Sequence, residues 1–505
     1  MFRGHFRHTI DPKGRLSIPA KFREVLREAG SDRLVMAPNG TALDVYPEDK
    51  WRELEDRVNG LAKLDPDRRR FQHVYLSAGL DVVLDPHGRI QILQDYRERG
   101  GLSKNVVIIG MMDHFEIWDD DRWTIYQREQ AGPLDDLRER LARTRFPDEI
   151  PGSGWTYGTN LAYLRELVAY WRERFDWRVA EARLNALPQF RARVGGLGIH
   201  FIHVRGTGPA PLPLVITHGW PGSVAEFVEV IGPLTDPARH GGDPADAFDV
   251  VAPSMPGYGF SDHPTEPGMD PERIAALWAE LMAGLGYQRF GAQGGDWGAM
   301  VTTYLGARHP ARVLGIHLNM VIALPEDPQN PSLEGLTQEE VVDLMAVQQF
   351  LKEETGYQRI QGTKPQTLAY ALNDSPAGLA AWIVEKFRTW SDCDGEIERR
   401  FTKDQLLTNI MLYWVPETAN SSCRLYYEAV HADKFPPSGL RVEVPTGCAI
   451  FPREIIKPPR AWAERVFNVQ RWTRMERGGH FAAMEEPGAL VEDIRAFFRP
   501  LRRGR

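Results

Sequence analysis

Short apolar runs alternate with helical segments along much of the chain beyond residue 195. These runs are too short for buried helices, so each predicts a strand. They lie at Ile199–Val204, Leu212–Thr217, Phe248–Ala252, Val442–Val444 and Cys448–Phe451. Helices are predicted between them at Val224–Ile231 and after them at Leu490–Phe498. Such alternation predicts a mostly parallel sheet that is covered by helices on both faces.

Two regions without buried-strand patterns accompany this sheet. Residues 324–440 are helical and punctuated by prolines, which predicts a lid inserted between two parts of the core, residues 195–323 and 441–505. Residues 134–194 combine helical spacing with many aromatic residues, which we expect to be buried against the next domain. These aromatic residues are Trp155, Tyr157, Tyr163, Tyr170, Trp171, Phe175 and Trp177.

The first 127 residues contain an internal repeat. The segment Thr9–Ile18 recurs as Val83–Ile92, and a short charged helical run follows each copy. Each copy places a Pro-x-Gly turn between apolar runs, which predicts a β-hairpin that leads into a helix. Since neither half could bury a core alone, the repeat predicts pseudo-twofold packing of two half-domains. Asp11 and Arg15 are expected first to pair across their turn.

The composition is that of a globular protein with several domains. The 505 residues exceed one ordinary domain, and a hydrophobic fraction of 42% with a charged fraction of 26% indicates a soluble protein. The net charge of −8 argues against non-specific nucleic-acid binding by the whole chain, but not against a local basic face. Three scattered cysteines, no signal peptide and no bilayer span predict a cytoplasmic or nucleoid-associated protein without a structural metal.

The segment Gln293–Ala299 has the form of a nucleophile elbow with a carboxylate in place of the usual serine. A strand is predicted before it, at Tyr287–Ala292, and a helix after it, at Ala299–His309. A strand that turns sharply into a helix holds its central residue in strained geometry and needs glycines around it. Asp296 is therefore predicted at the tip of the turn.

Three further segments come at predicted strand ends, where α/β proteins place their functional loops. His218–Gly222 follows one strand, and its glycines allow backbone amides to face a developing negative charge. Glu454 lies just after the strand at Cys448–Phe451, and His480 follows late in the chain. The order of nucleophile, acid and histidine is that of an α/β-hydrolase triad, which predicts that these side chains act together with Asp296.

A carboxylate nucleophile restricts the reaction class. Aspartate attacks saturated carbon and leaves an alkyl ester, which a histidine-activated water then hydrolyses. Alkyl halides and epoxides are the two natural substrates, since a departing halide needs N–H donors whereas an epoxide oxygen needs a proton. Tyr357 and Tyr426, both in the predicted lid, are candidates for that proton donor, although most tyrosines only pack.

Residues from about 134 to 499 resemble the microsomal-type epoxide hydrolases with their N-terminal extension domain. The motifs that carry the resemblance are His218–Ser223, Pro256–Ser261, Gly294–Gly298, Gln361–Pro365, Leu372–Pro376 and Gly478–Phe481. The resemblance implies an α/β-hydrolase that opens a small apolar epoxide with water and without a cofactor. One departure is that the strand usual before Leu134 is missing or is replaced by Arg122–Gln127.

This resemblance also implies a role for each candidate site residue. The roles are Asp296 as the nucleophile, Glu454 and His480 as the charge-relay pair, Tyr357 and Tyr426 as proton donors, and the backbone amides of Trp220 and Trp297 as the oxyanion hole.

The first part of the chain resembles the MraZ family of bacterial transcription regulators over nearly the whole family length. The family has two AbrB-like swapped-hairpin halves with an Asp-x-x-x-Arg signature, kept here at residues 11–15 and 85–89. The resemblance implies ring-like homo-oligomers that touch promoter DNA. The implied contacts are Arg3, His5, Arg7, Lys13 and Arg15. Phosphate contacts of this kind are salt-sensitive, and they position a protein rather than specify a sequence.

The leading interpretation is an epoxide hydrolase joined to a MraZ-like DNA-binding domain by a short polar linker, residues 128–133. Three alternatives stay open. A haloalkane dehalogenase shares the Asp-His framework. The chain can instead be a DNA-binding regulator with a sensory or inactive hydrolase half. Lastly, two unrelated chains can have been joined by an artefact.

Overall fold

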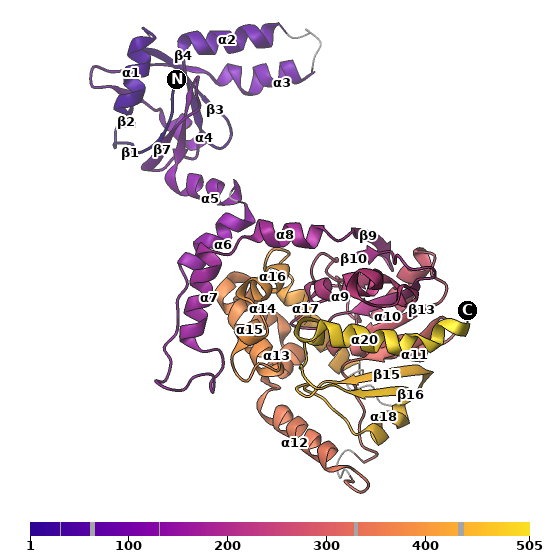
Figure 1. Ribbon diagram of the computed structural model, residues 1–505. Helices are drawn as coiled ribbons and strands as arrows, with labels where there is room; N and C mark the ends of the chain where they lie inside the picture. Colours follow the sequence, from indigo (N-terminus) through magenta and orange to yellow (C-terminus); the bar gives the residue numbers. More distant parts are fainter. Residues whose placement is uncertain (31, 61–65, 131, 328–331, 433–438, 505) are drawn as a thin grey trace. The chain divides into compact units, whose positions relative to one another are not determined.

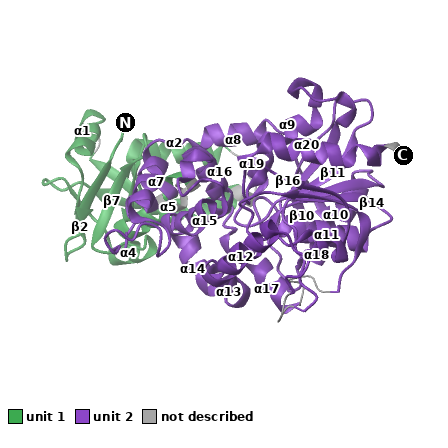
Figure 2. Ribbon diagram, turned by 60° about the horizontal axis from the view of Figure 1, so that its bottom comes forward, with its two compact units in different colours: residues 1–136 green, residues 137–505 purple. Residues whose placement is uncertain are grey.

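The computed structural model describes residues 1–505 except 31, 61–65, 131, 328–331, 433–438 and 505 (Figure 1). The chain forms two compact units, residues 1–136 and residues 137–505 (Figure 2). The first unit contains an antiparallel sheet, and the second contains a mostly parallel sheet. None of the helices in the described part of the chain has the length and hydrophobicity needed to cross a membrane.

The first unit is mainly β. Its large sheet has the strand order β1-β7-β8-β4-β3-β5, and β2 pairs separately with β6. The strands are β1 His5–Thr9, β2 Arg15–Ser17, β3 Arg33–Pro38, β4 Leu43–Pro47, β5 Leu80–Val83, β6 Arg89–Gln91, β7 Asn105–Gly110 and β8 Phe115–Asp119. The helices are α1 Ala20–Glu28, α2 Glu48–Asn59, α3 Pro66–Val74, α4 Gln94–Arg99 and α5 Asp120–Gln130, with a 3-10 turn at Leu76–Ala78. Phe2, Phe22 and Phe115 pack ring against ring in its core.

The two copies of the repeat form the same turn. Asp11 accepts hydrogen bonds from the backbone amide of Arg15 at 2.9 Å and from its Nε at 2.7 Å. Asp85 accepts from the amide of Arg89 at 2.9 Å and from its Nε at 2.8 Å. The expected pairing of Asp11 with Arg15 across the turn is therefore confirmed, and the signature shared by the copies has a structural role.

The strands of each copy pair differently from the predicted hairpins. β2 pairs with β6 of the other copy, with Leu16 opposite Ile90, while β1 pairs with β7 and β5 pairs with β3. Within the first copy, one bridge joins Ile10 to Leu16. Each copy has the predicted turn, but most of its strand pairing lies outside the copy, and the three-residue strands bury Leu16 and Ile90 by pairing across the repeat.

The sheet of the second unit has the strand order β16-β15-β14-β13-β11-β12-β10-β9. It is parallel from β16 to β12, and β10 runs antiparallel to both β12 and β9. The strands are β9 Gln189–Val194, β10 Leu197–Val204, β11 Leu212–Thr217, β12 Phe248–Pro253, β13 Phe290–Gly294, β14 Val313–Leu318, β15 Val442–Ile450 and β16 Phe467–Arg474. The predicted mostly parallel sheet is confirmed, and three of its strands match β10, β11 and β12 closely.

Helices cover both faces of this sheet. In Figure 2, α9 and α20 lie on one side of the strands, and α10 and α11 lie on the other. The helices are α9 Val228–Thr235, α10 Pro271–Gly284, α11 Asp296–Arg308, α18 Arg460–Val466, α19 Ala482–Glu485 and α20 Pro487–Phe498. Shorter 3-10 turns lie at Val224–Phe227, Pro237–His240, Pro244–Asp246, Ile397–Arg399 and Pro500–Gly504. The helix predicted at Val224–Ile231 is thus a 3-10 turn followed by α9.

Among the described residues between β14 and β15 there are six helices, in the segment where the sequence predicts an inserted lid, and they are referred to as the lid. They are α12 Gln338–Glu353, α13 Gly356–Thr363, α14 Pro365–Asp374, α15 Pro376–Trp390, α16 Lys403–Trp414 and α17 Ala419–His431. Helices α13, α14 and α17 pack against one another, so the segments that carry Tyr357 and Tyr426 are neighbours.

The extension before the sheet contains α6 Pro133–Ala142, α7 Leu161–Glu173 and α8 Trp177–Asn185. Helix α7 packs against α15 and α16 of the lid, where the hydroxyl of Tyr170 donates to Asp404 at 2.8 Å. Trp171 is buried, but Tyr157 is 79% exposed. The expectation that all the aromatic residues are buried is wrong for Tyr157, which lies in a glycine-rich loop outside any helix.

Helical residues also occupy most of the segment predicted as a linker. Helix α5 continues to Gln130 and α6 begins at Pro133. The segment Arg122–Gln127, expected to replace a strand, lies within α5.

Candidate active site

Asp296 lies at the tip of a sharp turn between β13 and α11. Its φ of 49° falls in the left-handed region, which residues other than glycine and asparagine rarely adopt. The positions of Gly295 and Gly298 on either side of Asp296 leave no room for a side chain. A Cβ on Gly298 would lie 2.5 Å from the Thr217 carbonyl carbon, and one on Gly295 would lie 2.8 Å from Asn319 Oδ1. The geometry is that of the predicted elbow, with the helix beginning at Asp296 rather than three residues later.

His480 lies between two carboxylates. Its Nδ1 is 2.7 Å from Glu454 Oε1, and its Nε2 is 3.1 Å from Asp296 Oδ2. Burial acts to lower the pKa of His480, but the negative charges of Glu454 and Asp296 overcome this and raise it well above its usual value. The structure thus brings together three residues that are 184 and 26 positions apart in the chain, in the arrangement expected from the sequence.

A backbone amide faces the Asp296 carboxylate. The amide of Trp220 donates to Asp296 Oδ1 at 2.8 Å. Trp297 follows Asp296 in the first turn of α11, where backbone amides have no acceptor within the helix. Gly219 permits the close approach, since a Cβ at this position would lie 2.5 Å from Asp296 Cγ.

The loop that supplies Trp220 is anchored by the lid. Asn409 Nδ2 in α16 donates to the carbonyl of Pro221 at 2.7 Å, and Tyr413 in the same helix donates to the carbonyl of Gly222 at 2.5 Å. His218 is buried beneath the loop, and burial lowers its pKa to about 4, so it is neutral at pH 7. Its Nε2 accepts from the amide of Met255 at 3.3 Å, which makes His218 a structural residue.

Tyr357 and Tyr426 project from α13 and α17 toward Asp296. Their rings meet edge to face with centroids 5.8 Å apart, and Trp220 stacks on Tyr357 at 5.1 Å. Burial raises the pKa of each hydroxyl well above its usual value, and the charge of Asp296 adds to the rise. Both tyrosines therefore stay protonated at neutral pH and remain hydrogen-bond donors.

Two small cavities meet at Asp296. One, of about 30 Å³, is mostly apolar and is lined by Asp296, Trp297, Met300, Met320, Phe350, Tyr357, Gln358, Tyr426, Ile455 and Ile456. The other, of about 20 Å³, is bounded by the Trp220 loop, by His480 and by polar side chains at neighbouring strand ends. Asp296 is the residue that lines both. The tyrosines and the histidine therefore face different sides of the same carboxylate.

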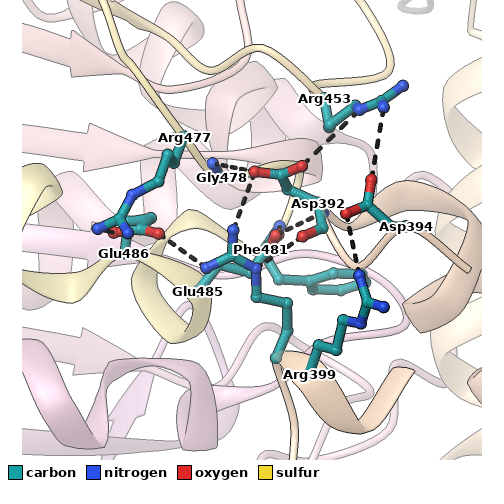
Figure 3. A network of polar contacts seen from close by, with 10 residues as sticks. Asp392, Asp394, Arg399, Arg453, Arg477, Gly478, Phe481, Glu485 and Glu486 are labelled. Carbon is teal, nitrogen blue, oxygen red and sulfur yellow. Dashed lines mark hydrogen bonds and ion pairs between the residues drawn. The ribbon is translucent and has the colours of Figure 1, made fainter. Parts of the chain in front are cut away.

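A network of ion pairs and hydrogen bonds holds the histidine loop, residues 478–481, against the end of α15 (Figure 3). Asp392 Oδ2 accepts from the amide of Gly478 at 2.9 Å and from Arg400 Nη2 at 2.9 Å. Glu485 accepts from the amides of Asp392 at 2.7 Å and Phe481 at 3.0 Å. Burial raises the pKa of Glu485 to about 7. The network fixes the backbone on both sides of the imidazole.

Several residues around the site were not found from the sequence. Asn319 follows β14 directly and accepts from Gln293 Nε2 at 2.8 Å beside Asp296. Its position at a strand end was the one available signal. Glu226 and Glu485 had no such signal, because each reaches the site from a helical turn that follows a loop.

One group of side chains with metal-like spacing occurs among the described residues, and it lies in the first unit. Potential ligand atoms of Asp44, His114 and Glu116 all lie within 4.8 Å of one another. Asp44 already accepts from Tyr75, and Glu116 accepts from Trp118 Nε1 at 2.7 Å. Because these carboxylates already accept hydrogen bonds, the three side chains are interpreted as part of a polar cluster.

The residues expected to touch DNA lie at or near β1 and the first repeat turn. Arg3, His5, Arg7 and Lys13 are exposed, whereas Arg15 is half-buried. Arg7 pairs with Asp120 at 2.9 Å, and Arg15 pairs with Asp11. The four exposed side chains are therefore better candidates for phosphate contacts than the half-buried Arg15.

Comparisons with known proteins identify both parts of the chain. Residues 126–227 match the family model "Epoxide hydrolase N terminus", and residues 213–394 match "alpha/beta hydrolase fold". Epoxide hydrolase 1 of Sus scrofa is 40% identical over 390 residues, which cover 72% of this chain and 86% of the relative. The chain belongs to the epoxide hydrolase family. Residues 1–74 and 77–145 match the model of the MraZ protein.

Solved structures of epoxide hydrolases share this fold. The juvenile hormone epoxide hydrolase of Bombyx mori superposes with a TM-score of 0.67 at 34% identity, covering 73% of this chain and 92% of that one. The epoxide hydrolase of Aspergillus niger gives a TM-score of 0.66 at 30% identity, covering 73% and 93%. The second unit is thus an α/β-hydrolase fold of an epoxide hydrolase, and the comparisons favour this activity over a haloalkane dehalogenase.

Proposed function

We propose that the enzyme converts an epoxide to a vicinal diol through an ester on Asp296. The observation that carries this proposal is the placement of one carboxylate between two protonated tyrosines on an apolar side and a histidine on a polar side. Because the cavity on the tyrosine side is mostly apolar, we expect an apolar epoxide as the substrate.

In the first half-reaction, the Asp296 carboxylate attacks a ring carbon and the carbon–oxygen bond of the epoxide breaks. Tyr357 and Tyr426 hydrogen-bond to the epoxide oxygen, and one of them gives it a proton. Their burial supports this role, because it keeps both hydroxyls protonated until a stronger base, the departing alkoxide, forms beside them.

In the second half-reaction, His480 takes a proton from water, and the hydroxide attacks Cγ of the Asp296 ester. Ester formation removes the charge of Asp296, which is one of the two charges that raise the pKa of His480. The imidazolium then gives up its proton, which balances the proton that the tyrosine gave to the alkoxide and restores the neutral tyrosine. The neutral imidazole, still oriented by Glu454, acts as the base. The amides of Trp220 and Trp297 stabilise the tetrahedral oxyanion, a contact worth roughly 3 kcal/mol for each donor.

Oxygen tracing tests the ester. After a single turnover with styrene oxide in ¹⁸O-labelled water, the label is expected in the protein and not in the first diol. His480→Gln is expected to accumulate a protein whose mass has increased by one substrate molecule, and Asp296→Asn is expected to form no diol. Label in the first diol, or no adduct on His480→Gln, would contradict the mechanism. Chloride release from a chloroalkane would instead support the dehalogenase.

We further propose that the first unit binds promoter DNA as part of a homo-oligomer, with its repeat halves as a pseudo-twofold pair of swapped hairpins. The pairing of β2 with β6 across the repeat and the match to MraZ support this proposal. The exposed residues Arg3, His5, Arg7 and Lys13 are the expected phosphate contacts.

A DNA-mobility assay across a salt series tests the proposal. Binding is expected to weaken steeply with salt, and Lys13→Glu with Arg3→Glu is expected to abolish it while leaving styrene oxide hydrolysis unchanged. Wild-type affinity in the double variant, or no binding at low salt, would contradict the proposal.

A further inference from the structure

The cavity on the histidine side of Asp296 is a site for a single water. Its volume is about 20 Å³, and a water needs about 10 to 15 Å³ of such space with two or more polar partners. The polar side chains that line it include Asp296, His480, Asn319 and Glu226. The proposed mechanism assigns no role to Glu226.

Glu226 is built into the loop that faces Asp296. It belongs to the 3-10 turn Val224–Phe227, and its carboxyl group packs over Gly222, where a Cβ would lie 2.6 Å from Glu226 Cδ. Burial raises the pKa of Glu226 to about 8, and the charge of Asp296 adds to the rise, whereas His480 opposes it. At pH 7 the group is a neutral acid that offers a carbonyl acceptor and a hydroxyl donor.

Glu226 lines a second, larger pocket as well. It lines a surface cleft of about 500 Å³ between α8, the start of α9 and α16, together with residues such as Ala225 and Thr408. Neither tyrosine lines the small cavity or this cleft. Entry of water from this cleft past Glu226 would not cross the apolar side proposed to receive the epoxide.

We propose that Glu226 binds the hydrolytic water. Its carbonyl oxygen accepts a hydrogen bond from one O–H of the water, and His480 Nε2 accepts a hydrogen bond from the other. This inference rests on the ester mechanism proposed above. The O–H bond facing Nε2 breaks, its proton moves to His480, and the oxygen forms a bond to Cγ of the Asp296 ester while the C=O electrons move onto the carbonyl oxygen. When the carbonyl re-forms, the bond between Cγ and the substrate oxygen breaks, and the departing diol takes the proton from His480. The second O–H of the water stays hydrogen-bonded to the Glu226 carbonyl, so a lone pair of the water oxygen is directed at the ester carbon. Glu226 thereby acts in ester hydrolysis and not in epoxide opening.

Stopped-flow kinetics of the full-length protein with styrene oxide separate the two half-reactions. Glu226→Met removes the acceptor without a change of charge at pH 7, and hydrolysis of the ester is expected to slow by roughly 10- to 100-fold. The rate of ester formation is expected to stay within about threefold of wild type, so the ester accumulates. Glu226→Gln keeps a carbonyl acceptor and is expected to restore most of the hydrolysis rate.

Matched variants make the test specific. Glu229→Met, one turn further on at a carboxylate that pairs with Arg183 at the surface, is expected to change neither rate. Tyr357→Phe is expected to show the opposite split, with slow ester formation. Glu226→Ala repeats the test if Glu226→Met does not fold.

The inference is overturned if a folded Glu226→Met or Glu226→Ala protein hydrolyses the ester at the wild-type rate, or if both half-reactions slow together. Failure of the ester mechanism itself looks different, because His480→Gln would then trap no adduct.

Discussion

Replacement of Gly219 by alanine tests whether close approach of the Trp220 loop to Asp296 is required for catalysis. A Cβ at residue 219 would lie 2.5 Å from Asp296 Cγ and closer still to its Oδ1 and Cβ. Carbon atoms in ordinary contact are about 3.5 Å apart, so the loop and the carboxylate must separate by about 1 Å. Rotation of the side chain cannot relieve this overlap, because Asp296 Cβ is fixed by the strained backbone of the elbow.

The expected cost follows from that displacement. Separation weakens the 2.8 Å hydrogen bond from the Trp220 amide to Asp296 Oδ1 and moves the nucleophile relative to both tyrosines. A misplacement of about 1 Å can reduce rates about 100-fold, equivalent to about 2.7 kcal/mol of transition-state free energy. We therefore expect Gly219→Ala to slow both ester formation and ester hydrolysis by about 100-fold.

Single-turnover kinetics with styrene oxide measure both rates, and circular dichroism melting checks that the variant folds. Gly284→Ala is the matched control, since open space surrounds the last residue of α10. It should leave both rates unchanged and should increase the free energy of unfolding by about 0.5 to 1 kcal/mol. Ester formation within about threefold of wild type in a folded Gly219→Ala protein would refute the reasoning.

Three further predictions concern proton donation, the histidine loop and stability. Tyr357→Phe and Tyr426→Phe should each slow ester formation by roughly 10- to 100-fold, and the double variant should form no ester in rapid-quench experiments; additive small effects would argue against shared donation. Arg400→Met removes the ion pairs that Arg400 makes with the half-buried carboxylates of Asp392 and Glu486, so the melting temperature and the rate of ester hydrolysis should both fall; an unchanged rate would mean that the network does not position the imidazole. Burial acts to raise the pKa of Asp493, but hydrogen bonding and charge from His317 outweigh it and hold the pKa at about 2. This depressed pKa stabilises the fold above about pH 4 by roughly 2 kcal/mol, and the contribution is lost as pH falls toward 2. Asp493→Asn should therefore lower the melting temperature at pH 7, with a deficit that shrinks below pH 4; a deficit independent of pH would contradict this account.

The sequence predicts β10, β11 and β12 well because each is a short apolar run, which is a local signal. It does not indicate β9, β14 or β16, and the two runs predicted at Val442–Val444 and Cys448–Phe451 form the single strand β15. The first unit shows the limit of such signals. The repeat is visible in the sequence, but the pairing of Leu16 with Ile90 joins strands of three residues far apart in the chain. So short a strand carries no pattern that specifies its partner, so the pairing across the repeat could not be predicted from the two copies.

In the candidate site, too, some residues can be predicted from the sequence and others cannot. The triad order and the strand ends indicate Asp296, Glu454 and His480 before any coordinates are known, and the structure brings them within hydrogen-bonding distance. The two tyrosines are indistinguishable by pattern from packed tyrosines. Contacts such as that of Glu485 with the Asp392 amide join residues 93 positions apart and depend on how loops fold back onto the lid. No spacing rule predicts them.

In the proposed ester mechanism, the two cavities allow one carboxylate to serve two half-reactions in turn. The alkyl group is held on the tyrosine side, and Asp296 is the residue that lines both cavities. Water approaches Cγ from the histidine side, so it does not have to displace the bound alkyl group. Loss of the Asp296 charge on ester formation lowers the pKa of His480 only when there is an ester to hydrolyse. In this mechanism, electrostatics and geometry together set the order of the two steps.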